Sequence, residues 1–156
     1  MTDGKWISVN GIVERGYAVA SGQSKNNPYP QGTLDIQLPL FKDRGLDLLS
    51  YFRGTLNISI SPYTFRMTNP QYTFRKVNWT PLHPPEDFSF SRCGIIFAET
   101  RYDGWVYYPH PETKIRNFQK PDIIEVIAQA IPNLQYGDKI TVVINTDEIS
   151  LIKSLA

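Results

Sequence analysis

The sequence predicts a mainly β protein, a closed or nearly closed barrel of about eight short strands. Many short segments alternate apolar and polar residues with the period of two that is typical of half-buried strands. The chain has 156 residues, and its 12 prolines and 10 glycines interrupt these segments often. Short strands broken by many prolines need covered edges, and a barrel covers them.

The first elements follow from the chain in order. A strand is predicted over Trp6 to Glu14, with Gly11 inside it as the mark of a bulge or a close approach. A second short strand of small residues is expected over 16–22, and the polar segment 23–31 reads as a surface loop. The best early helix is predicted over 43–52, because its leucines and Phe52 lie near one face.

The clearest strand is predicted over 55–60, where apolar and polar side chains alternate. Thr55 and Asn57 lie two residues apart on its polar face, and both carry neutral oxygen atoms. The phrase Gly-Thr-Leu also occurs earlier in the chain, which predicts a related strand over 33–38 with Thr33 and Asp35 in the matching places. A strand of this kind needs no function, so plain structure is the competing interpretation.

The rest of the chain is rich in β-prone segments. Asp103-Gly104 predicts a hairpin turn into a strand that carries Trp105, and 81–87 is a proline-rich loop. Tyr136-Gly137-Asp138 predicts a turn before the last strand, and 146–156 reads as a short helix or a loose end. The further predicted strands are 64–67, 72–79, 88–90, 93–98, 123–128 and 139–145.

Length and composition restrict the class of protein. Residues 1–156 suit one domain, and a net charge of +1 with scattered Lys and Arg predicts no nucleic-acid partner. The single cysteine, Cys93, excludes an internal disulfide. The polar start and the absence of a long apolar run predict no signal peptide and no membrane span, so we expect a cytoplasmic protein. The oligomeric state stays open.

Glu125 is the single residue that points most sharply to chemistry. It interrupts the apolar run 123–128, and burying a carboxylate is costly unless it is paired or serves a ligand. The alternative is that Glu125 faces solvent, because Ile124 and Val126 share the opposite face of a strand.

A metal site is a weaker possibility. Two histidines and two glutamates recur in similar proline-rich phrases near a cysteine, and such side chains bind transition metals. Their spacing matches no known metal pattern, and the chain has no P-loop, no Rossmann turn and no recognisable Ser-His-Asp pattern. The residues concerned are His83, Glu86, Cys93, His110 and Glu112.

Taken together, the order of these pieces resembles the archaeal CTP-dependent riboflavin kinases, which are small cradle-loop barrels. The resemblance implies one riboflavin kinase-like domain over 1–156, a six-to-eight-stranded cradle-loop barrel with one or two short helices. It implies an enzyme that transfers a phosphoryl group from CTP or another nucleoside triphosphate to riboflavin, with Mg²⁺. The matching pieces are Gly11, Gly16, the helix at 43–52, Gly54-Thr55-Leu56-Asn57, Pro109 with Thr113, 124–128 and Tyr136-Gly137-Asp138.

The resemblance also assigns roles to residues. Thr55 and Asn57 match the family's magnesium ligands, and hard oxygen atoms suit that ion. Thr113 and Glu125 match the residues that contact the flavin, so riboflavin or its phosphate FMN is the expected ligand. The catalytic assignment falls on Glu125, which as an acid near the ribityl hydroxyl orients or deprotonates it.

The chain departs from the family in several places. Gly11 and Gly16 match the glycine-rich cofactor-binding turn, but Ala18 and Ala20 stand where further glycines are expected. Ile131-Pro132 falls where the family has a Leu-Arg pair near the nucleotide. The competing hypothesis is therefore a barrel that kept the fold and a ligand pocket but lost catalysis. A DNA-binding barrel is disfavoured by the balanced charge.

Overall fold

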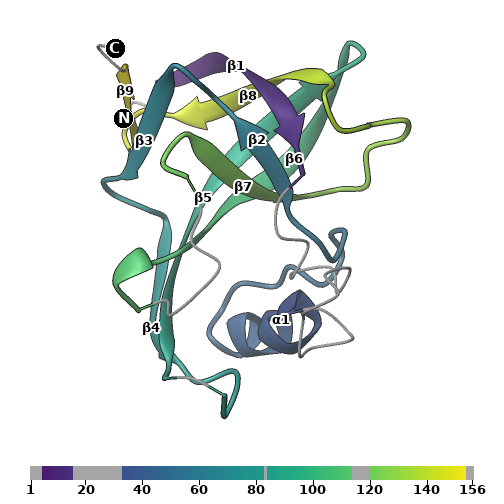
Figure 1. Ribbon diagram of the computed structural model, residues 1–156. Helices are drawn as coiled ribbons and strands as arrows, with labels where there is room; N and C mark the ends of the chain where they lie inside the picture. Colours follow the sequence, from purple (N-terminus) through teal and green to yellow (C-terminus); the bar gives the residue numbers. More distant parts are fainter. Residues whose placement is uncertain (1–4, 16–32, 83, 114–119, 154–156) are drawn as a thin grey trace.

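The computed structural model describes residues 5–15, 33–82, 84–113 and 120–153. Six antiparallel strands close into a barrel in the order β1, β2, β7, β6, β5 and β8, and β8 pairs again with β1 (Figure 1). The mainly β barrel that the sequence predicts is thus confirmed. The barrel strands are β1 (Trp6–Glu14), β2 (Leu56–Ser59), β5 (Glu86–Phe97), β6 (Thr100–Pro109), β7 (Ile123–Ala128) and β8 (Lys139–Asn145).

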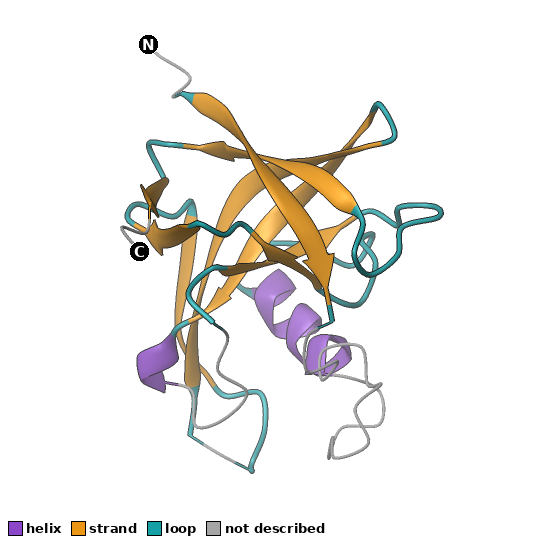
Figure 2. Cartoon of the chain, turned by 45° about the horizontal axis from the view of Figure 1, so that its top comes forward, coloured by secondary structure: helices purple, strands orange, loops and turns teal. Residues whose placement is uncertain are grey.

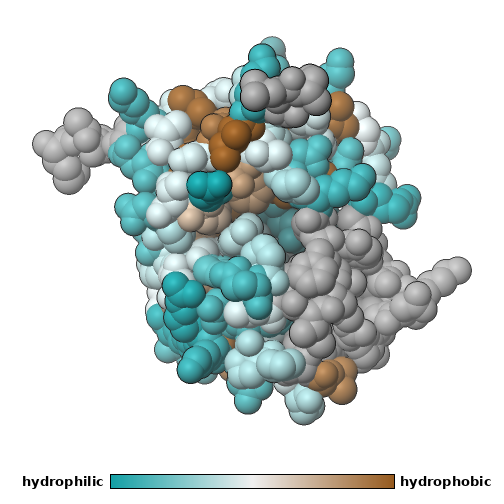
Figure 3. All heavy atoms as spheres, turned by 60° about the vertical axis from the view of Figure 1, so that its left-hand side comes forward, coloured by the Kyte–Doolittle hydropathy of each residue, from teal (hydrophilic) through white to brown (hydrophobic). Residues whose placement is uncertain are grey.

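The other elements lie outside the barrel wall. Strand β4 (Tyr72–Val77) pairs with β5 and extends the sheet, whereas β3 (Tyr63–Met67) and β9 (Ile149–Lys153) form a separate two-stranded ladder. The side of the molecule that carries these three strands is mostly hydrophilic, with a small hydrophobic area near the top of the view (Figure 3). A 3₁₀ turn, η1 (Pro111–Thr113), follows β6.

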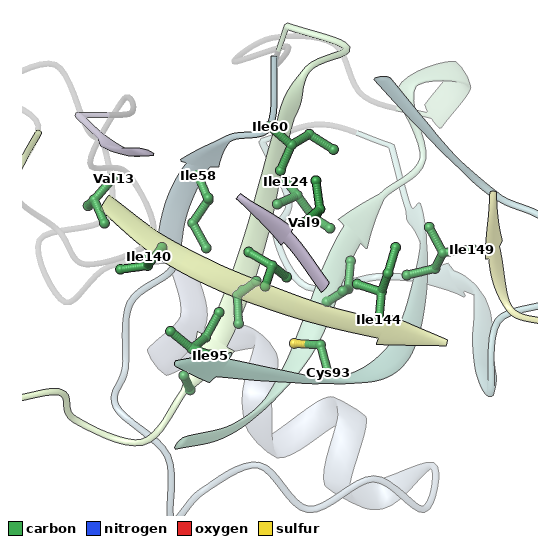
Figure 4. Close-up of a cluster of buried hydrophobic side chains, with 14 residues drawn as sticks. Val9, Val13, Ile58, Ile60, Cys93, Ile95, Ile124, Ile140, Ile144 and Ile149 are labelled. Atoms are coloured by element: carbon green, nitrogen blue, oxygen red, sulfur yellow. The ribbon is translucent and has the colours of Figure 1, made fainter. Parts of the chain in front are cut away.

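Aliphatic side chains fill the barrel because the strands alternate as the sequence predicts. Ile58 and Ile124 point inward and are fully or almost fully buried (Figure 4). The buried members of this core are Val9, Val13, Ile58, Ile60, Cys93, Ile95, Val106, Ile124, Val126, Ala128, Ile140, Val142, Ile144 and Ile149.

A second core lies between the outer face of the barrel and α1 (Thr33–Asp43), which runs beside the barrel (Figure 2). Leu34, Leu38 and Phe41 have no exposed surface and follow the spacing of one helix face. The ring of Phe41 lies 5.1 Å from that of Phe88 and 5.0 Å from that of Phe90, centroid to centroid. The helix is therefore fixed by aromatic packing.

The predicted strand over 33–38 is wrong, because this segment forms α1. Its leucines fit both periods: Leu34, Ile36 and Leu38 alternate as in a strand, whereas Leu34, Leu38 and Phe41 share a helix face. Packing of that helix face on the second core decides the outcome. The echo of Gly-Thr-Leu therefore marks no second strand.

The predicted helix over 43–52 is also wrong. Gly45, at φ 111°, ends α1, and the amide of Leu46 donates to the carbonyl of Phe41. This is a Schellman arrangement, in which a left-handed glycine closes a helix. Leu46 and Leu48 still enter the second core, but from an irregular segment.

The turn between β5 and β6 differs from the predicted one. The predicted strands 88–90 and 93–98 form one strand, β5, and Ala98 and Glu99 make its turn with φ angles of 50° and 64°. Two successive positive φ angles are typical of a two-residue hairpin turn of type I′. Gly104 lies inside β6, where an added Cβ would come 2.9 Å from the carbonyl oxygen of Ile127. Because residue 104 is a glycine, β7 can approach β6 closely at this point.

The remaining predictions have different outcomes. The strand over 139–145 is confirmed as β8, and its preceding turn has Gly137 at φ 91°. The tail is neither a helix nor loose over 149–153, because β9 pairs there with β3. The predicted strand and loop over 16–31 lie outside the described residues.

In the described part of the chain, no helix is long and apolar enough to cross a membrane.

Candidate functional site

Thr55, Asn57 and Glu125 meet on the outer face of the barrel, where β2 pairs with β7. Asn57 and Glu125 lie directly opposite each other in the register of these strands. The hydroxyl of Thr55 donates a hydrogen bond to Oε1 of Glu125, at 3.3 Å. All three residues are half-buried. They cluster because Ile58 and Ile124 face inward, which turns their neighbours in both strands outward.

Tyr107 and Gln37 form the buried side of this site. Val106 pairs with Val126, so the next outward residue of β6, Tyr107, comes alongside Glu125. The hydroxyl of Tyr107 donates to Oε1 of Gln37 on α1, at 2.6 Å. Burial raises the pKa of Tyr107 well above its usual value, and the carboxylate of Glu125 raises it further. Tyr107 is therefore a neutral hydrogen-bond donor that joins the site to α1.

The sequence pattern singles out neither Tyr107 nor Gln37 for this site. Gln37 falls in a segment that reads as a strand, so a contact between a helix and β6 is not predictable from that interpretation. The signal that could reveal it is the helical spacing of Leu34, Leu38 and Phe41, which places Gln37 next to a buried face.

The donor atoms of the site suit a magnesium ion. Thr55 offers a hydroxyl and Asn57 an amide oxygen, and Mg²⁺ prefers such hard oxygen ligands and keeps several waters. Among the described residues, no three His, Cys, Asp or Glu side chains gather as a metal-binding group. A magnesium ion here would therefore be held by few protein oxygens and by the phosphates of a substrate.

The packing of β1 against β2 explains why residue 11 is a glycine. It faces the barrel interior, where an added Cβ would overlap Cγ2 of Ile58 and lie 3.3 Å from the carbonyl oxygen of Ser59. Glycine is thus required for β1 to approach β2 at this point. Gly16, with Ala18 and Ala20, lies outside the described residues.

Thr113 lies in η1, where its hydroxyl is used to close a turn. Oγ1 accepts a hydrogen bond from the amide of Asp87 at 2.9 Å and donates one to the carbonyl of His110 at 3.1 Å. These bonds tie the Thr113 side chain to Asp87 and His110, and in the described part of the chain it makes no hydrogen bond to Glu125. Only the resemblance to the riboflavin kinases assigns Thr113 and Glu125 to one site.

Cys93 and His110, both in the described part of the chain, do not form a shared metal site. Cys93 is buried inside the barrel, and this burial raises the pKa of its thiol to about 12. Nδ1 of His110 lies 3.2 Å from Oε2 of Glu112, while His83 is outside the described residues. The structure therefore does not bring Cys93 together with His110 and Glu112 as a metal site.

The fold also forms a Ser-His-Glu chain that the sequence pattern does not reveal. Nε2 of His110 lies 2.7 Å from the hydroxyl of Ser89, and that hydroxyl also lies 2.9 Å from the hydroxyl of Thr73. Ser89 has only 1% of its surface exposed, and it lies within β5 between β4 and β6. A nucleophile must reach its substrate, so this chain is best understood as a polar tie across the sheet.

A scan against models of protein families finds no match to the chain, and a search of curated proteins finds none either. The resemblance to the riboflavin kinases therefore depends on the order of short motifs.

Proposed function

We propose that the protein is a magnesium-dependent phosphotransferase that passes a phosphoryl group from a nucleoside triphosphate, CTP in the first instance, to riboflavin. The observation that supports it is the meeting of Thr55, Asn57 and Glu125 on one face of the β2–β7 pair. These residues come from two distant segments, and the resemblance assigns them to the metal and to the acceptor. The cytoplasm remains the expected location.

Each residue has a role that its chemistry allows. Thr55 and Asn57 would hold Mg²⁺, which when bound neutralises phosphate charge. Glu125 would accept a hydrogen bond, and then the proton, from the ribityl hydroxyl as that oxygen bonds to the γ-phosphorus and the β–γ bridging bond breaks. Phosphoryl transfer depends mainly on position and charge, so few protein groups suffice.

Tyr107 would line the buried side of this carboxylate. It is 5% exposed and bonded to Gln37, which is 2% exposed, so solvent is excluded behind Glu125. A carboxylate with one dry side has stronger electrostatic interactions than one in bulk water.

The second candidate is a non-catalytic β-barrel that binds a ligand or a partner. Two observations favour it: Gly11 is explained by packing against Ile58, and the hydroxyl of Thr113 is engaged by Asp87 and His110. Both residues match the family, yet both have a structural use that needs no ligand.

A turnover assay separates these candidates. The purified protein is incubated with riboflavin, MgCl₂ and each of CTP, ATP, GTP and UTP, and FMN is measured by chromatography with fluorescence detection. We expect FMN with at least one nucleotide and none when EDTA is added. Riboflavin binding without FMN formation would favour the non-catalytic barrel, and absence of both would reject the proposal.

A double variant tests the proposed metal ligands. Thr55→Ala with Asn57→Ala should abolish FMN formation and leave the fold intact, because both residues are on the outer face. The lost hydrogen bond from Thr55 to Glu125 costs about 0.5–1.5 kcal/mol of stability. The matched control is Ser59→Ala, which removes a hydroxyl from the next outward position of the same strand. Normal turnover in the double variant would remove both residues from the metal site.

A further inference from the structure

A nucleoside triphosphate needs positive charge that the three site residues do not supply. Thr55 and Asn57 are neutral, and Glu125 is an acid. A binding site for triphosphate in this protein therefore calls for a cation from another position.

Arg53 lies close to Thr55 along the chain. It precedes Thr55 by two residues, and Nη1 lies 3.1 Å from Oδ1 of Asp35 in the first turn of α1. The ion pair thus holds the guanidinium at the junction between α1 and the segment that enters β2.

The surroundings of Arg53 leave it able to bind an anion. Its side chain is 49% exposed, and that of Asp35 is 32% exposed. An exposed ion pair stabilises a protein by only about 0–1 kcal/mol, so a polyanion can displace the carboxylate. A guanidinium has five N–H donors in a planar fork that matches phosphate oxygens, and the pair with Asp35 uses one nitrogen.

We infer that Arg53 is a phosphate-binding residue that gives this site its preference for a nucleoside triphosphate over a monophosphate. Without a nucleotide, Asp35 pairs with Arg53, and when a nucleotide binds, Asp35 competes with its phosphates for the Arg53 side chain. The inference rests on the proposed function, because it assumes that the nucleotide binds beside Thr55 and Asn57.

Two substitutions that break the same ion pair test the inference. Arg53→Gln and Asp35→Asn each remove the Arg53–Asp35 contact, so a purely structural role predicts the same result for both. A phosphate-binding role predicts that Arg53→Gln weakens CTP binding about 10- to 100-fold, the range for losing charged hydrogen bonds. Asp35→Asn should leave CTP affinity unchanged or raise it, because it removes the competitor.

The measurement is isothermal titration with CTP and with CMP, both in MgCl₂, followed by titration with riboflavin. We expect Arg53→Gln to reduce the ratio of CTP to CMP affinity at least tenfold, with riboflavin affinity unchanged. Arg53→Lys should recover part of the loss, since it keeps the charge without the fork.

The outcomes separate this inference from the function on which it rests. Normal CTP affinity in Arg53→Gln, or equal losses in Arg53→Gln and Asp35→Asn, would overturn the role of Arg53 and leave the phosphotransferase proposal standing. If the wild-type protein binds no nucleoside triphosphate, both the proposal and the inference fall.

Discussion

Substitution of Gly11 by alanine tests the packing between β1 and β2. The new methyl group would overlap Cγ2 of Ile58, a contact that cannot persist without movement. Ile58 is fully buried, and its branched side chain has few rotamers, so it cannot swing aside easily. Overpacking of this kind costs about 1–3 kcal/mol, and we expect Gly11→Ala to reduce the free energy of unfolding by that amount.

A double-mutant cycle gives the cause of the loss. Ile58→Ala alone should cost about 2–5 kcal/mol, because it removes a buried side chain and leaves a cavity. In the double variant the methyl group introduced by Gly11→Ala enters the space that Ile58 vacates. The loss in the double variant should therefore be smaller than the sum of the two separate losses by about 0.5–3 kcal/mol.

Urea denaturation followed by circular dichroism measures the free energy of unfolding of the three variants. Additive losses would refute the contact between Gly11 and Ile58, and so would a Gly11→Ala variant as stable as wild type. If Gly11 served only a ligand, the substitution would weaken riboflavin binding and leave the free energy of unfolding unchanged.

Three further predictions concern the cores and the charged groups. Phe41→Ala should reduce the free energy of unfolding by about 3–5 kcal/mol in the same assay, because its ring is fully buried in the second core. The backbone amide of Lys76 donates a hydrogen bond to the carboxylate of Asp87. This bond, with help from Arg75, lowers the pKa of Asp87 below its usual value near 3.8, although burial acts to raise it. Since the pKa is lower in the folded protein, this stabilisation is present above pH 3.8 and is lost as the pH falls through the folded value. Denaturation at several pH values should therefore show a smaller acid-side loss for Asp87→Asn than for wild type, and equal slopes would contradict the assignment. Cys93, 4% exposed and with a raised pKa, should react with a thiol reagent only after urea unfolding, and rapid labelling of the native protein would contradict its position in the barrel.

The strands were predictable where one face of a strand is buried. Alternation reveals β2, and it places Asn57 and Ile58 on opposite faces as the structure has them. The same rule reveals that Glu125 points away from the barrel interior, although the run around it is almost wholly apolar. These strands are specified locally, by side-chain direction alone.

The misassigned segments depend on contacts that the local pattern cannot reveal. Leu34 and Leu38 fit a strand and a helix equally well, and the rings of β5 that select the helix lie about fifty residues further along the chain. The turn at Ala98-Glu99 carries no glycine or asparagine, so its positive φ angles have no local signal.

The candidate site was predictable in part for the same physical reason. Alternation on β2 and β7 sets the outward direction of Asn57 and Glu125, but the pairing of these strands brings them together only in the folded chain. The contact between Tyr107 and Gln37 depends on α1 and could not be found while that segment read as a strand.

Flavin binding by the Glu125→Gln variant is the most direct test of the proposed site. Riboflavin and FMN are titrated against wild type and variant, and quenching of flavin fluorescence is measured. Glutamine keeps the shape of the side chain and removes its charge, so the affinity for riboflavin should fall by roughly 1.5–3 kcal/mol, the range for hydrogen bonds to a charged group. Equal affinities for the two proteins would show that Glu125 faces water without contacting the ligand, and a wild-type protein that binds neither flavin would reject the riboflavin proposal.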